Sequence, residues 1–539
     1  MENNHESGEN PQPGHTYTQE PVKPWGPIDR QYAKISPDVP RNIHIVGTGS
    51  IGKLVAHSLR GIPDPPPVTL IFHRGRLALA WDKSERRITV QDGEYTVPRG
   101  GFDFELYRPY LKQHGVMLQE VRDKGQVDIY GMSDDTGLKP HEVAEIVAEQ
   151  KTKDDAGERG ETGSQDDDKT VGGATVGGRE NAQRMNEAAI PEDEKGSVNT
   201  AKAATDADYQ PLEDEPRELD DFVSFEPIHN LIVTTKTVRT VTAVAALKHR
   251  LTRDSTICFL QNGMGVIDAV NEQVFPDEAT RPNYVQGIIS HGANVPPQMA
   301  AQDPFFVVHA GHGTIFLGVV PRKSLAQQVE EAGHSSATDG AGEADDGELD
   351  ETQVEKLPES ARYLIRTLTR TPVLAAVAVT PIELLQLQLE KLAVNSILNP
   401  LTSLFDNRNG TLNYNFPVTR LKRLMLAETC LVIRSLPELR GLPNVPTRFS
   451  SKRLENMTTS VAGRTKDNIS SMLADMRAGR QTEIQYINGY IIRRGEELGV
   501  KCVVNYAMMQ AVLAKSLMIE REYADEVPVE GAGEGLNRE

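Results

Sequence analysis

The stretch NIHIVGTGSIGKLVAHSLRG, residues 42–61, decides the fold of the first part of the chain. It opens with a short apolar run of the strand type, and its glycines then fall in the spacing G-x-G-x-x-G. Apolar residues at helical spacing follow and end at Gly61, a residue typical of helix C-termini. A second apolar run, VTLIFHR at 68–74, completes a strand–helix–strand unit, which predicts an α/β domain.

The glycine spacing indicates a Rossmann-type dinucleotide-binding loop. In such loops the first glycine permits a tight turn, the second lets a pyrophosphate approach the backbone, and the third lets the helix pack on the strand. The phosphates lie at the helix N-terminus, where backbone N–H groups and the helix dipole favour anions. We predict that the cofactor phosphates contact Gly47, Thr48, Gly49, Ser50, Ile51 and Gly52. A glycine-rich turn without a ligand is the alternative.

The end of the second strand bears on the choice between NAD and NADP. An acidic residue there would bind the ribose 2′-hydroxyl, but this chain has His73-Arg74-Gly75-Arg76. A guanidinium suits a 2′-phosphate because it forms paired, charge-assisted hydrogen bonds. We therefore predict NADPH as the cofactor, with Arg74 as the main contact to the 2′-phosphate. The alternative is an arginine that is merely solvated at the surface.

Composition divides the chain. We expect a disordered lead over residues 1–40, a dinucleotide-binding domain over 41–380, a helical domain over 381–525 and a disordered tail over 526–539. Inserts at 133–218 and 325–356 interrupt the α/β domain, and their polar composition cannot offset the entropy cost of ordering. Residues 151–220 hold 19 acidic and 9 basic residues, and 331–356 hold 9 and 1, within a total charge of −19. The inserts could be regulatory, could bind a basic partner or could be neutral surface expansions, and we favour the neutral expansion.

The rest of the composition argues against several classes of protein. Outside the inserts the chain is nearly neutral, whereas nucleic-acid binding requires a basic face. No apolar run approaches the length of a membrane span. The 3 cysteines are far apart in apolar contexts, so we expect buried thiols, no disulfide framework and no metal site. We expect a cytoplasmic protein because the first residues resemble no targeting signal, with mitochondrial import left open.

A second informative stretch is EKLAVNSILNP, residues 390–400. Lys391, Asn395 and Asn399 fall at i, i+4 and i+8 and share one face of a predicted helix whose other residues are apolar. A buried lysine near the start of a helix is costly, and desolvation lowers its pKa toward that of a useful proton donor. The alternative is a lysine that extends to solvent beside two hydrogen-bonded asparagines.

Polar residues elsewhere fit the same site. Asn262 follows an apolar strand in FLQNGMG, where its amide would reach a nicotinamide or its ribose. Asn468 and Ser471 lie at a predicted helix start, and Glu483 comes twelve residues after Ser471. We expect Ser471 and Glu483 to lie on one helix, about three turns apart.

Together these motifs resemble the ketopantoate reductase (2-dehydropantoate 2-reductase) family. The resemblance rests on GTGSIG, LQNGMG, EKLAVNSILNPLTSLFDNRNGTL, NISSMLADMRAGRQTEIQYINGY and IIRRGEELGV. It covers residues 42–130, 225–322 and 360–520, and the two inserts depart from the family pattern. It implies a Rossmann domain followed by an all-α domain, with the active site in the cleft between them.

The resemblance also implies roles for single residues. Lys391 would be the general acid, and Glu483 would hold the substrate hydroxyl and orient the lysine. Lys236 and Asn262 would contact the cofactor. The residues expected to line the substrate pocket are Asn395, Asn399, Asn409, Asn468 and Ser471. The implied reaction is NADPH-dependent reduction of 2-dehydropantoate to pantoate, a precursor in pantothenate and coenzyme A biosynthesis.

Some alternatives stay open on the sequence alone. The resemblance implies a small 2-keto acid as the substrate, and a reductase of another 2-keto acid would carry the same motifs. A non-catalytic relative that keeps the fold, and a homodimer, are also open. We interpret His291, His309 and His312 as structural polar residues at strand ends, in preference to proton shuttles.

Overall fold

The stretch that carries the glycine loop forms the centre of a parallel sheet. The computed structural model describes residues 36–107, 222–322 and 357–523. Strand β1 (Ile43–Val46) pairs in parallel with β2 (Val68–Phe72) on one side and β6 (Asn230–Val233) on the other. All three strands are buried throughout, which explains why their sequences are apolar without alternation. The predicted strand–helix–strand unit is confirmed, with α2 (Ser50–Leu59) as its helix.

The main sheet has eight strands in the order β12-β11-β8-β7-β6-β1-β2-β5. Strands β1, β2, β5, β6, β7 and β8 are parallel, whereas β11 is antiparallel to β8 and parallel to β12. Because β1, β7 and β8 run in the same direction, their carboxyl ends lie at one edge of the sheet. The strands added here are β5 (Phe102–Leu106), β7 (Thr256–Phe259), β8 (Asn283–Ile289), β11 (Ile315–Val320) and β12 (Ala376–Ala378).

A smaller sheet of four strands, in the order β4-β3-β10-β9, was not predicted. Its strands are β3 (Ile88–Asp92), β4 (Tyr95–Arg99), β9 (Gly292–Asn294) and β10 (Phe306–Gly311). The hairpin between β3 and β4 has a two-residue loop in which Gly93 has a φ of +58°. A glycine at the first position of a two-residue loop is a hairpin signal, so the sequence did contain this information.

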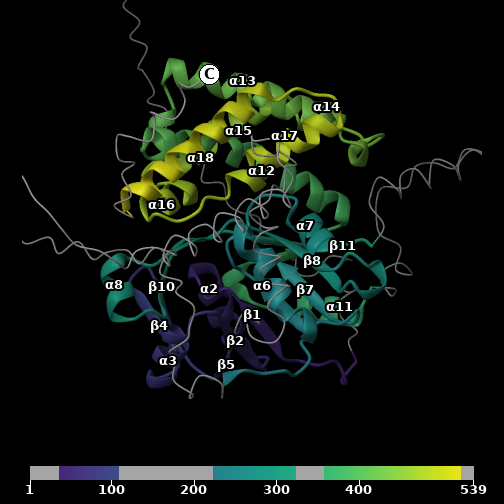
Figure 1. Cartoon of the computed structure of the whole chain (residues 1–539), viewed down its shortest axis with the longest axis vertical. Helices are drawn as coiled ribbons and strands as arrows, with labels where there is room; N and C mark the ends of the chain where they lie inside the picture. The colour runs from purple at the N-terminus through teal and green to yellow at the C-terminus, as the bar shows by residue number, and fades with distance from the viewer. Residues whose placement is uncertain (1–35, 108–221, 323–356, 524–539) are drawn as a thin grey trace, which may run out of the picture. The chain divides into compact units, whose positions relative to one another are not determined.

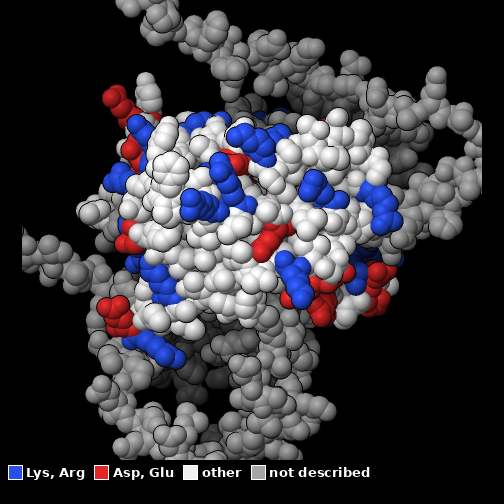
Figure 2. Space-filling model, turned by 90° about the horizontal axis from the view of Figure 1, so that it is seen from above, with Lys and Arg blue, Asp and Glu red and all other residues white. Residues whose placement is uncertain are grey.

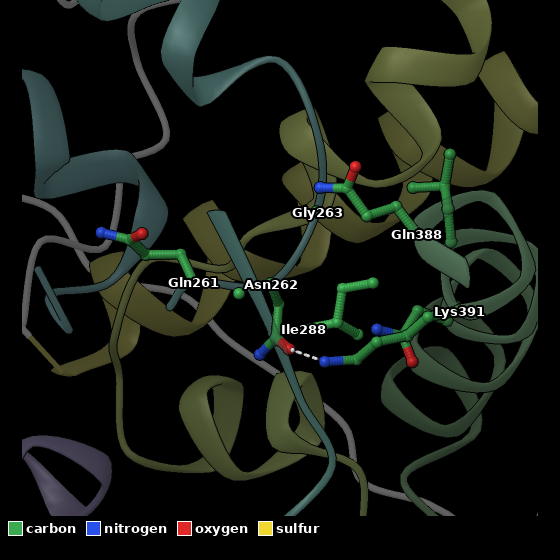
Figure 3. Close-up of a pocket in the computed structure, with 9 residues that line it drawn as sticks. Gln261, Asn262, Gly263, Ile288, Gln388 and Lys391 are labelled. Carbon is green, nitrogen blue, oxygen red and sulfur yellow. Dashed lines mark hydrogen bonds between the residues drawn. The ribbon is translucent and has the colours of Figure 1, made fainter. Parts of the chain in front are cut away.

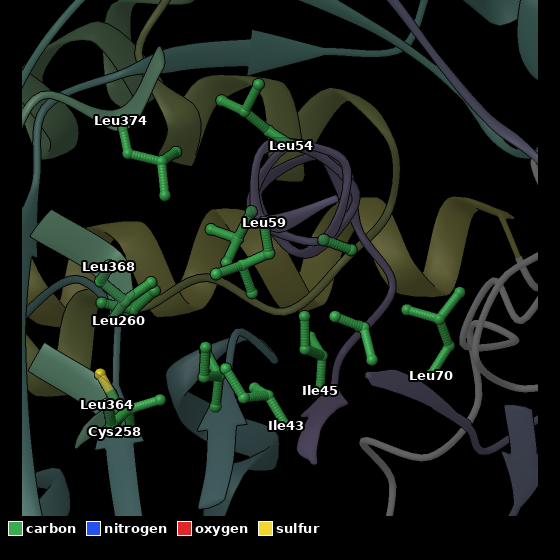
Figure 4. Close-up of a cluster of buried hydrophobic side chains, with 14 of the residues drawn as sticks. Ile43, Ile45, Leu54, Leu59, Leu70, Cys258, Leu260, Leu364, Leu368 and Leu374 are labelled. Carbon is green, nitrogen blue, oxygen red and sulfur yellow. The ribbon is translucent and has the colours of Figure 1, made fainter. Parts of the chain in front are cut away.

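Helix α2 packs between the two sheets, where it contacts β1 and β2 as well as β3 and β10. Leu54 and Leu59 of α2 join Ile43 and Ile45 of β1 in one apolar core (Figure 4). Helix α11 completes this core with Leu364, and all of these side chains are buried. The helices of this half are α3 (Gly75–Lys83), α6 (Thr240–Leu247), α7 (Val266–Gln273), α8 (Pro297–Gln302) and α11 (Glu359–Thr369).

The second half is helical and has an apolar core of its own. Its central helix, α12 (Pro381–Phe405), contacts α13, α15, α16 and α18, which Figure 1 shows around it. Thr380 and Glu383 form a reciprocal capping box that fixes where α12 begins. The other helices are α13 (Phe416–Ser435), α14 (Val445–Arg448), α15 (Ser451–Arg464), α16 (Ser471–Arg477), α17 (Asn488–Glu497) and α18 (Val503–Tyr523).

A proline lies inside α12 without ending it. Pro400 has no N–H, so the carbonyl of Ser396 one turn earlier lacks its helical donor. The buried side chain of Asn488 supplies one, because its Nδ2 donates to Ser396 O at 3.0 Å. Helix α17 therefore compensates for the hydrogen bond that the sequence of α12 removes.

One predicted helix is wrong. Ser471 and Glu483 do not share a helix, because α16 ends at Arg477 and Glu483 directly precedes a 3-10 turn over Ile484–Tyr486. Gly479, with a φ of +61°, turns the chain out of the helix in the left-handed conformation favoured after a helix C-terminus.

The remaining expectations concern bulk properties. The predicted disordered segments lie almost wholly outside the described residues, and the described residues all belong to one compact unit. Cys258, Cys430 and Cys502 are buried free thiols, as predicted. In the described parts of the chain, no helix has the length and apolar character needed to cross a membrane. Figure 2 shows one face on which basic and acidic side chains are interspersed among uncharged ones.

Candidate active site

The glycine loop lies between the carboxyl end of β1 and the first turn of α2. Gly47 has a φ of +97°, and an added Cβ atom there would overlap the backbone of Thr235. A Cβ atom at Gly52 would overlap the carbonyl of Gly47, so only glycine fits both positions. At Gly49, by contrast, no atom lies within 4 Å of an added Cβ. The backbone at Gly49 is therefore open to an approaching ligand.

The first turn of α2 has the features of an anion site. Gly49 is its N-cap, no side-chain hydrogen bond caps it, and the turn contains no acidic residue. The positive end of the helix dipole therefore points to the open space beside Gly49. Thr234 holds the loop in place by donating from its hydroxyl to Gly47 O at 2.6 Å. These residues fit the phosphates of a dinucleotide.

Arg74 lies at the same edge of the sheet as the glycine loop. Strands β1 and β2 are parallel, Val46 pairs with Ile71, and Arg74 is the partly buried N-cap residue of α3 two positions after β2 ends. In dinucleotide-binding folds this position faces the ribose nearest the adenine. The location suits a 2′-phosphate contact, which stays a prediction.

Lys391 lies in the middle of α12 and not near its start, and it meets the carboxyl edge of the sheet. Its Nζ donates to Asn262 Oδ1 at 2.9 Å (Figure 3) and to the backbone oxygen of Ile289 at 2.6 Å. Asn262 follows β7, and Ile289 ends β8. A cavity of about 20 Å³, roughly the scale of one water molecule, opens here. Its lining consists of Gln261, Asn262, Gly263, Gly287, Ile288, Gln388, Lys391, Leu392 and Asn395.

The surroundings of Lys391 act on its pKa in two opposite directions. Burial lowers the pKa of Lys391 to about 8, and the negative charge of Glu483 acts in the opposite direction. An ammonium has three N–H donors, and Asn262 and Ile289 accept two of them. The third donor remains for an oxygen atom in the cavity. A lysine in this state is suited to donate a proton near neutral pH.

Glu483 is buried beside this lysine, with 5% of its surface exposed. Its Oε1 accepts hydrogen bonds from the N–H and the hydroxyl of Thr237, both at 2.9 Å. Its Oε2 accepts from Nδ2 of Asn262 at 3.3 Å, while Oδ1 of Asn262 faces Lys391. Asn262 thus connects Lys391 with Glu483, and the charges on its two sides fix the orientation of its amide.

Comparison with known proteins agrees with this geometry. A family model described as ketopantoate reductase PanE/ApbA matches residues 178–322, and one for its C-terminal part matches residues 383–516. A probable 2-dehydropantoate 2-reductase of Schizosaccharomyces pombe is 30% identical over 304 residues, which make up 56% of this chain and 76% of that protein. The chain belongs to the ketopantoate reductase family. In this chain the glycine loop and α2 lie before residue 178, where the first matched segment begins.

Other relatives carry different names. A ketoisovalerate reductase of Gibberella fujikuroi is 25% identical over 298 residues, which cover 49% of this chain and 59% of that protein. Among solved structures, D-mandelate dehydrogenase with NADH and anilino(oxo)acetate has a TM-score of 0.50 at 14% identity, covering 89% of this chain and 99% of that chain. The second likeness shows the fold alone. Membership of the ketopantoate reductase family therefore does not determine which keto acid is the substrate, because that depends on the shape of the pocket.

Lys236, a predicted cofactor contact, forms an ion pair with the helical half. Its Nζ lies 2.6 Å from Asp475 Oδ2, and Arg480 donates to Oδ1 of the same carboxylate at 3.0 and 3.1 Å. Burial raises the pKa of Asp475, while both cations act to lower it. Lys236 is 39% exposed, so its ammonium still faces solvent on one side. Its contact with a cofactor stays a prediction.

The predicted substrate residues of α12 take two positions. Asn395 lines the cavity beside Lys391, one helical turn away. Asn399 is buried another turn along, and the cavity lining does not extend to it. The structure therefore brings Asn395, and not Asn399, to the lysine in this conformation.

Asn409 and Asn468 lie next to each other, away from the lining of this cavity. The backbone N–H of Asn409 donates to Asn468 O at 2.9 Å, and its Nδ2 donates to Thr465 Oγ1 at 2.9 Å. Ser471 is the exposed first residue of α16, whereas the preceding Ser470 caps that helix through its hydroxyl. Substrate contacts by these residues stay predictions.

Sequence reasoning missed Thr237 and Asp475. Thr237 is fully buried and supplies two of the donors to Glu483, and Asp475 is the partner of Lys236. The run VTTKT directly after an apolar strand was an available signal, because polar residues at the carboxyl ends of parallel strands gather at the ligand edge of the sheet.

Proposed function

We propose that this chain catalyses the NADPH-dependent reduction of 2-dehydropantoate to pantoate, and so serves pantothenate and coenzyme A biosynthesis. The observation that carries the proposal is Lys391. Its ammonium is held by Asn262 and Ile289 at the ligand edge of a dinucleotide-binding sheet, with one donor directed to a cavity. Membership of the ketopantoate reductase family supports the reaction class.

The residues of the site divide the work. When bound, NADPH supplies the hydride that adds to C2 of the keto acid. Lys391 donates a hydrogen bond to the C2 carbonyl oxygen and gives up its proton as negative charge develops there, an assistance worth about 10²–10⁴-fold in rate. Glu483 keeps the ammonium charged and accepts a hydrogen bond from the substrate hydroxyl. Asn262 holds both groups in place.

The substrate is tested by measuring NADPH consumption with 2-dehydropantoate, 2-ketoisovalerate and pyruvate in parallel. A kcat/KM for 2-dehydropantoate at least tenfold above the others supports the proposal. Preference for 2-ketoisovalerate favours the second candidate, a ketoisovalerate reductase, which the Gibberella relative supports. A folded protein that binds NADPH and turns over none of the three contradicts both candidates and favours a non-catalytic relative.

The cofactor preference is tested at Arg74. We expect Arg74→Ala to raise the KM for NADPH by about tenfold or more, the size of a lost charge-assisted hydrogen bond, and to leave the KM for NADH unchanged. Arg76→Ala is the matched control, because Arg76 is an exposed arginine two residues away. An equal effect of both substitutions, or an effect on NADH as large as on NADPH, would contradict the assignment.

A further inference from the structure

Three side chains with metal-ligand chemistry converge on the smaller sheet. Asp92 is the last residue of β3, and β10 runs parallel beside it with Val308 paired to Gln91, so His309 comes next to Asp92. His312 follows β10 in the turn to β11. The nitrogen and oxygen atoms of Asp92, His309 and His312 all lie within 4.8 Å of one another. Some 220 residues of sequence separate Asp92 from His312, so only the folded sheet brings them together.

His309 provides the decisive observation. It is 3% exposed, and its Nδ1 has no hydrogen-bond partner among the described residues. That nitrogen points to Asp92, with Oδ2 at 3.6 Å, while Oδ1 of the same carboxylate lies 3.0 Å from Nε2 of His312. A buried polar atom without a partner is uncommon and requires an explanation.

The tautomer of His309 follows from its neighbours. The backbone N–H of Gly313 donates to Nδ1 of His291 at 3.1 Å, so this nitrogen is an acceptor. Nε2 of His309 lies 3.0 Å from the same nitrogen and must therefore donate to it. The other nitrogen of His291 donates to Leu374 O at 2.9 Å. A neutral His309 thus carries its proton on Nε2 and directs the lone pair of Nδ1 at the carboxylate of Asp92.

A lone pair and a carboxylate oxygen that face each other repel, and a cation between them removes the repulsion. We propose that Asp92, His309 and His312 bind a divalent cation of the zinc class. Two imidazole nitrogens and one carboxylate form a donor set that zinc accepts, with a fourth position left to solvent. His291 serves as the outer partner that fixes the ring of a metal-binding histidine. The proposal departs from two expectations drawn from the sequence, that the three histidines are structural polar residues and that the chain has no metal site, because the fold brings three possible ligands together.

The bound cation would join three segments, of which β3 and the turn after β10 are already in contact through Asp92 and His312. Asp92 ends β3, His309 lies in β10, and His312 lies in the next turn. Phe306 of β10 also accepts a hydrogen bond from Lys53 of α2 at 2.9 Å, so the same strand holds the helix of the glycine loop. We therefore expect binding to raise the thermal stability of the domain, whatever reaction the enzyme catalyses.

The test uses the full chain without an affinity tag, freed of metal by EDTA. Isothermal titration with Zn²⁺ is expected to show a single site, and the thermal midpoint is expected to rise with Zn²⁺ and not with Mg²⁺. His312→Ala and Asp92→Asn change exposed or partly exposed side chains and are expected to weaken Zn²⁺ binding at least tenfold. His249→Ala, at an exposed histidine elsewhere, is the control and is expected to bind as the wild type does.

Two results would overturn the proposal. One is an absence of Zn²⁺ binding by the wild-type chain, which would leave a protonated His309 paired with Asp92 as the explanation of the cluster. The other is Zn²⁺ binding that His312→Ala and Asp92→Asn leave unchanged, which would place the ion elsewhere. If His309→Gln keeps the circular dichroism spectrum and loses Zn²⁺ binding, the buried ligand is established as well.

Discussion

Two lysines in this protein are alike in their lowered pKa and differ in their surroundings. Burial lowers the pKa of both Lys53 on α2 and Lys391 on α12 to about 8, and a nearby carboxylate opposes the shift in each case. Each ammonium also donates to two acceptors at short distances. The two lysines are therefore alike in charge, in pKa and in the number of hydrogen bonds that each donates.

Their surroundings differ. Lys53 donates to the backbone oxygens of Pro304 and Phe306 and so ties α2 to the smaller sheet. Lys391 donates to a side-chain amide that is itself held by Glu483, and a cavity opens beside it. A lowered pKa alone therefore shows only that a lysine is shielded from water. A lysine with a hydrogen-bond donor beside a cavity is, in addition, a candidate for a functional site. Substitutions at the two lysines should separate activity from stability.

The largest effect is expected at Lys391. Lys391→Ala removes the proton donor, so we expect kcat to fall about 10²–10⁴-fold with the circular dichroism spectrum unchanged. The measurement is steady-state NADPH consumption at saturating keto acid. A kcat that stays near the wild-type value would remove Lys391 from the mechanism.

The next effect concerns the pH dependence of kcat. A general acid acts when protonated, so kcat should fall as the pH rises through about 8, the pKa of Lys391. The charge of Glu483 raises that pKa, so Glu483→Gln should move the decline to lower pH as well as lower kcat. The profile is measured from roughly pH 6 to pH 10, a range that extends to either side of the pKa of Lys391. A decline at the same pH in both proteins would show that another group limits the rate.

A smaller effect, on stability alone, is expected at Lys53. Lys53→Met leaves two carbonyl oxygens without their donor, which costs about 1–3 kcal/mol of unfolding free energy. Urea unfolding measures this loss, and kcat of the folded variant should match the wild type. If Lys53→Met instead lowered kcat as strongly as Lys391→Ala, the expectation that Lys53 affects only stability would be contradicted.

The last effect is the dependence of this stability on pH. The folded chain holds the proton of Lys53 less tightly than the unfolded chain does, because its pKa is about 8 instead of 10.5. The unfolded state therefore binds more protons between these values, and the unfolding free energy rises with pH in that window. The stability difference between the wild type and Lys53→Met should widen from pH 8 to pH 10. A difference that narrows over this range would contradict the pKa assigned to Lys53.

Much of the fold could be predicted because its signals are local. The strand before Gly47, the loop and α2 follow one another within twenty residues, and the range of α12 matches its apolar pattern and its capping residues. The smaller sheet was missed because β10 pairs with β3 across more than two hundred residues, a contact that no local pattern encodes. Glu483 was placed on a helix because its side-chain hydrogen bonds, and not its neighbours in sequence, determine its conformation.

The site shows the same division. The buried row on α12 pointed to Lys391, and the family resemblance pointed to Glu483. Neither indicated that Asn262 joins them, because the two halves of its amide bond to residues 129 and 221 positions away. The histidine cluster escaped prediction for a similar reason, since Asp92 comes from a hairpin that had not been predicted.

The three glycines of the loop are required for different reasons. Gly47 and Gly52 are packed so closely that a larger residue would disturb folding itself, while an alanine at Gly49 meets no atom of the protein. We expect a Gly49→Ala chain to fold as the wild type does and to keep the predicted cofactor phosphates from approaching its backbone. One substitution could therefore remove the activity and leave the fold intact for another use. Measuring the amount of protein would not detect such a loss.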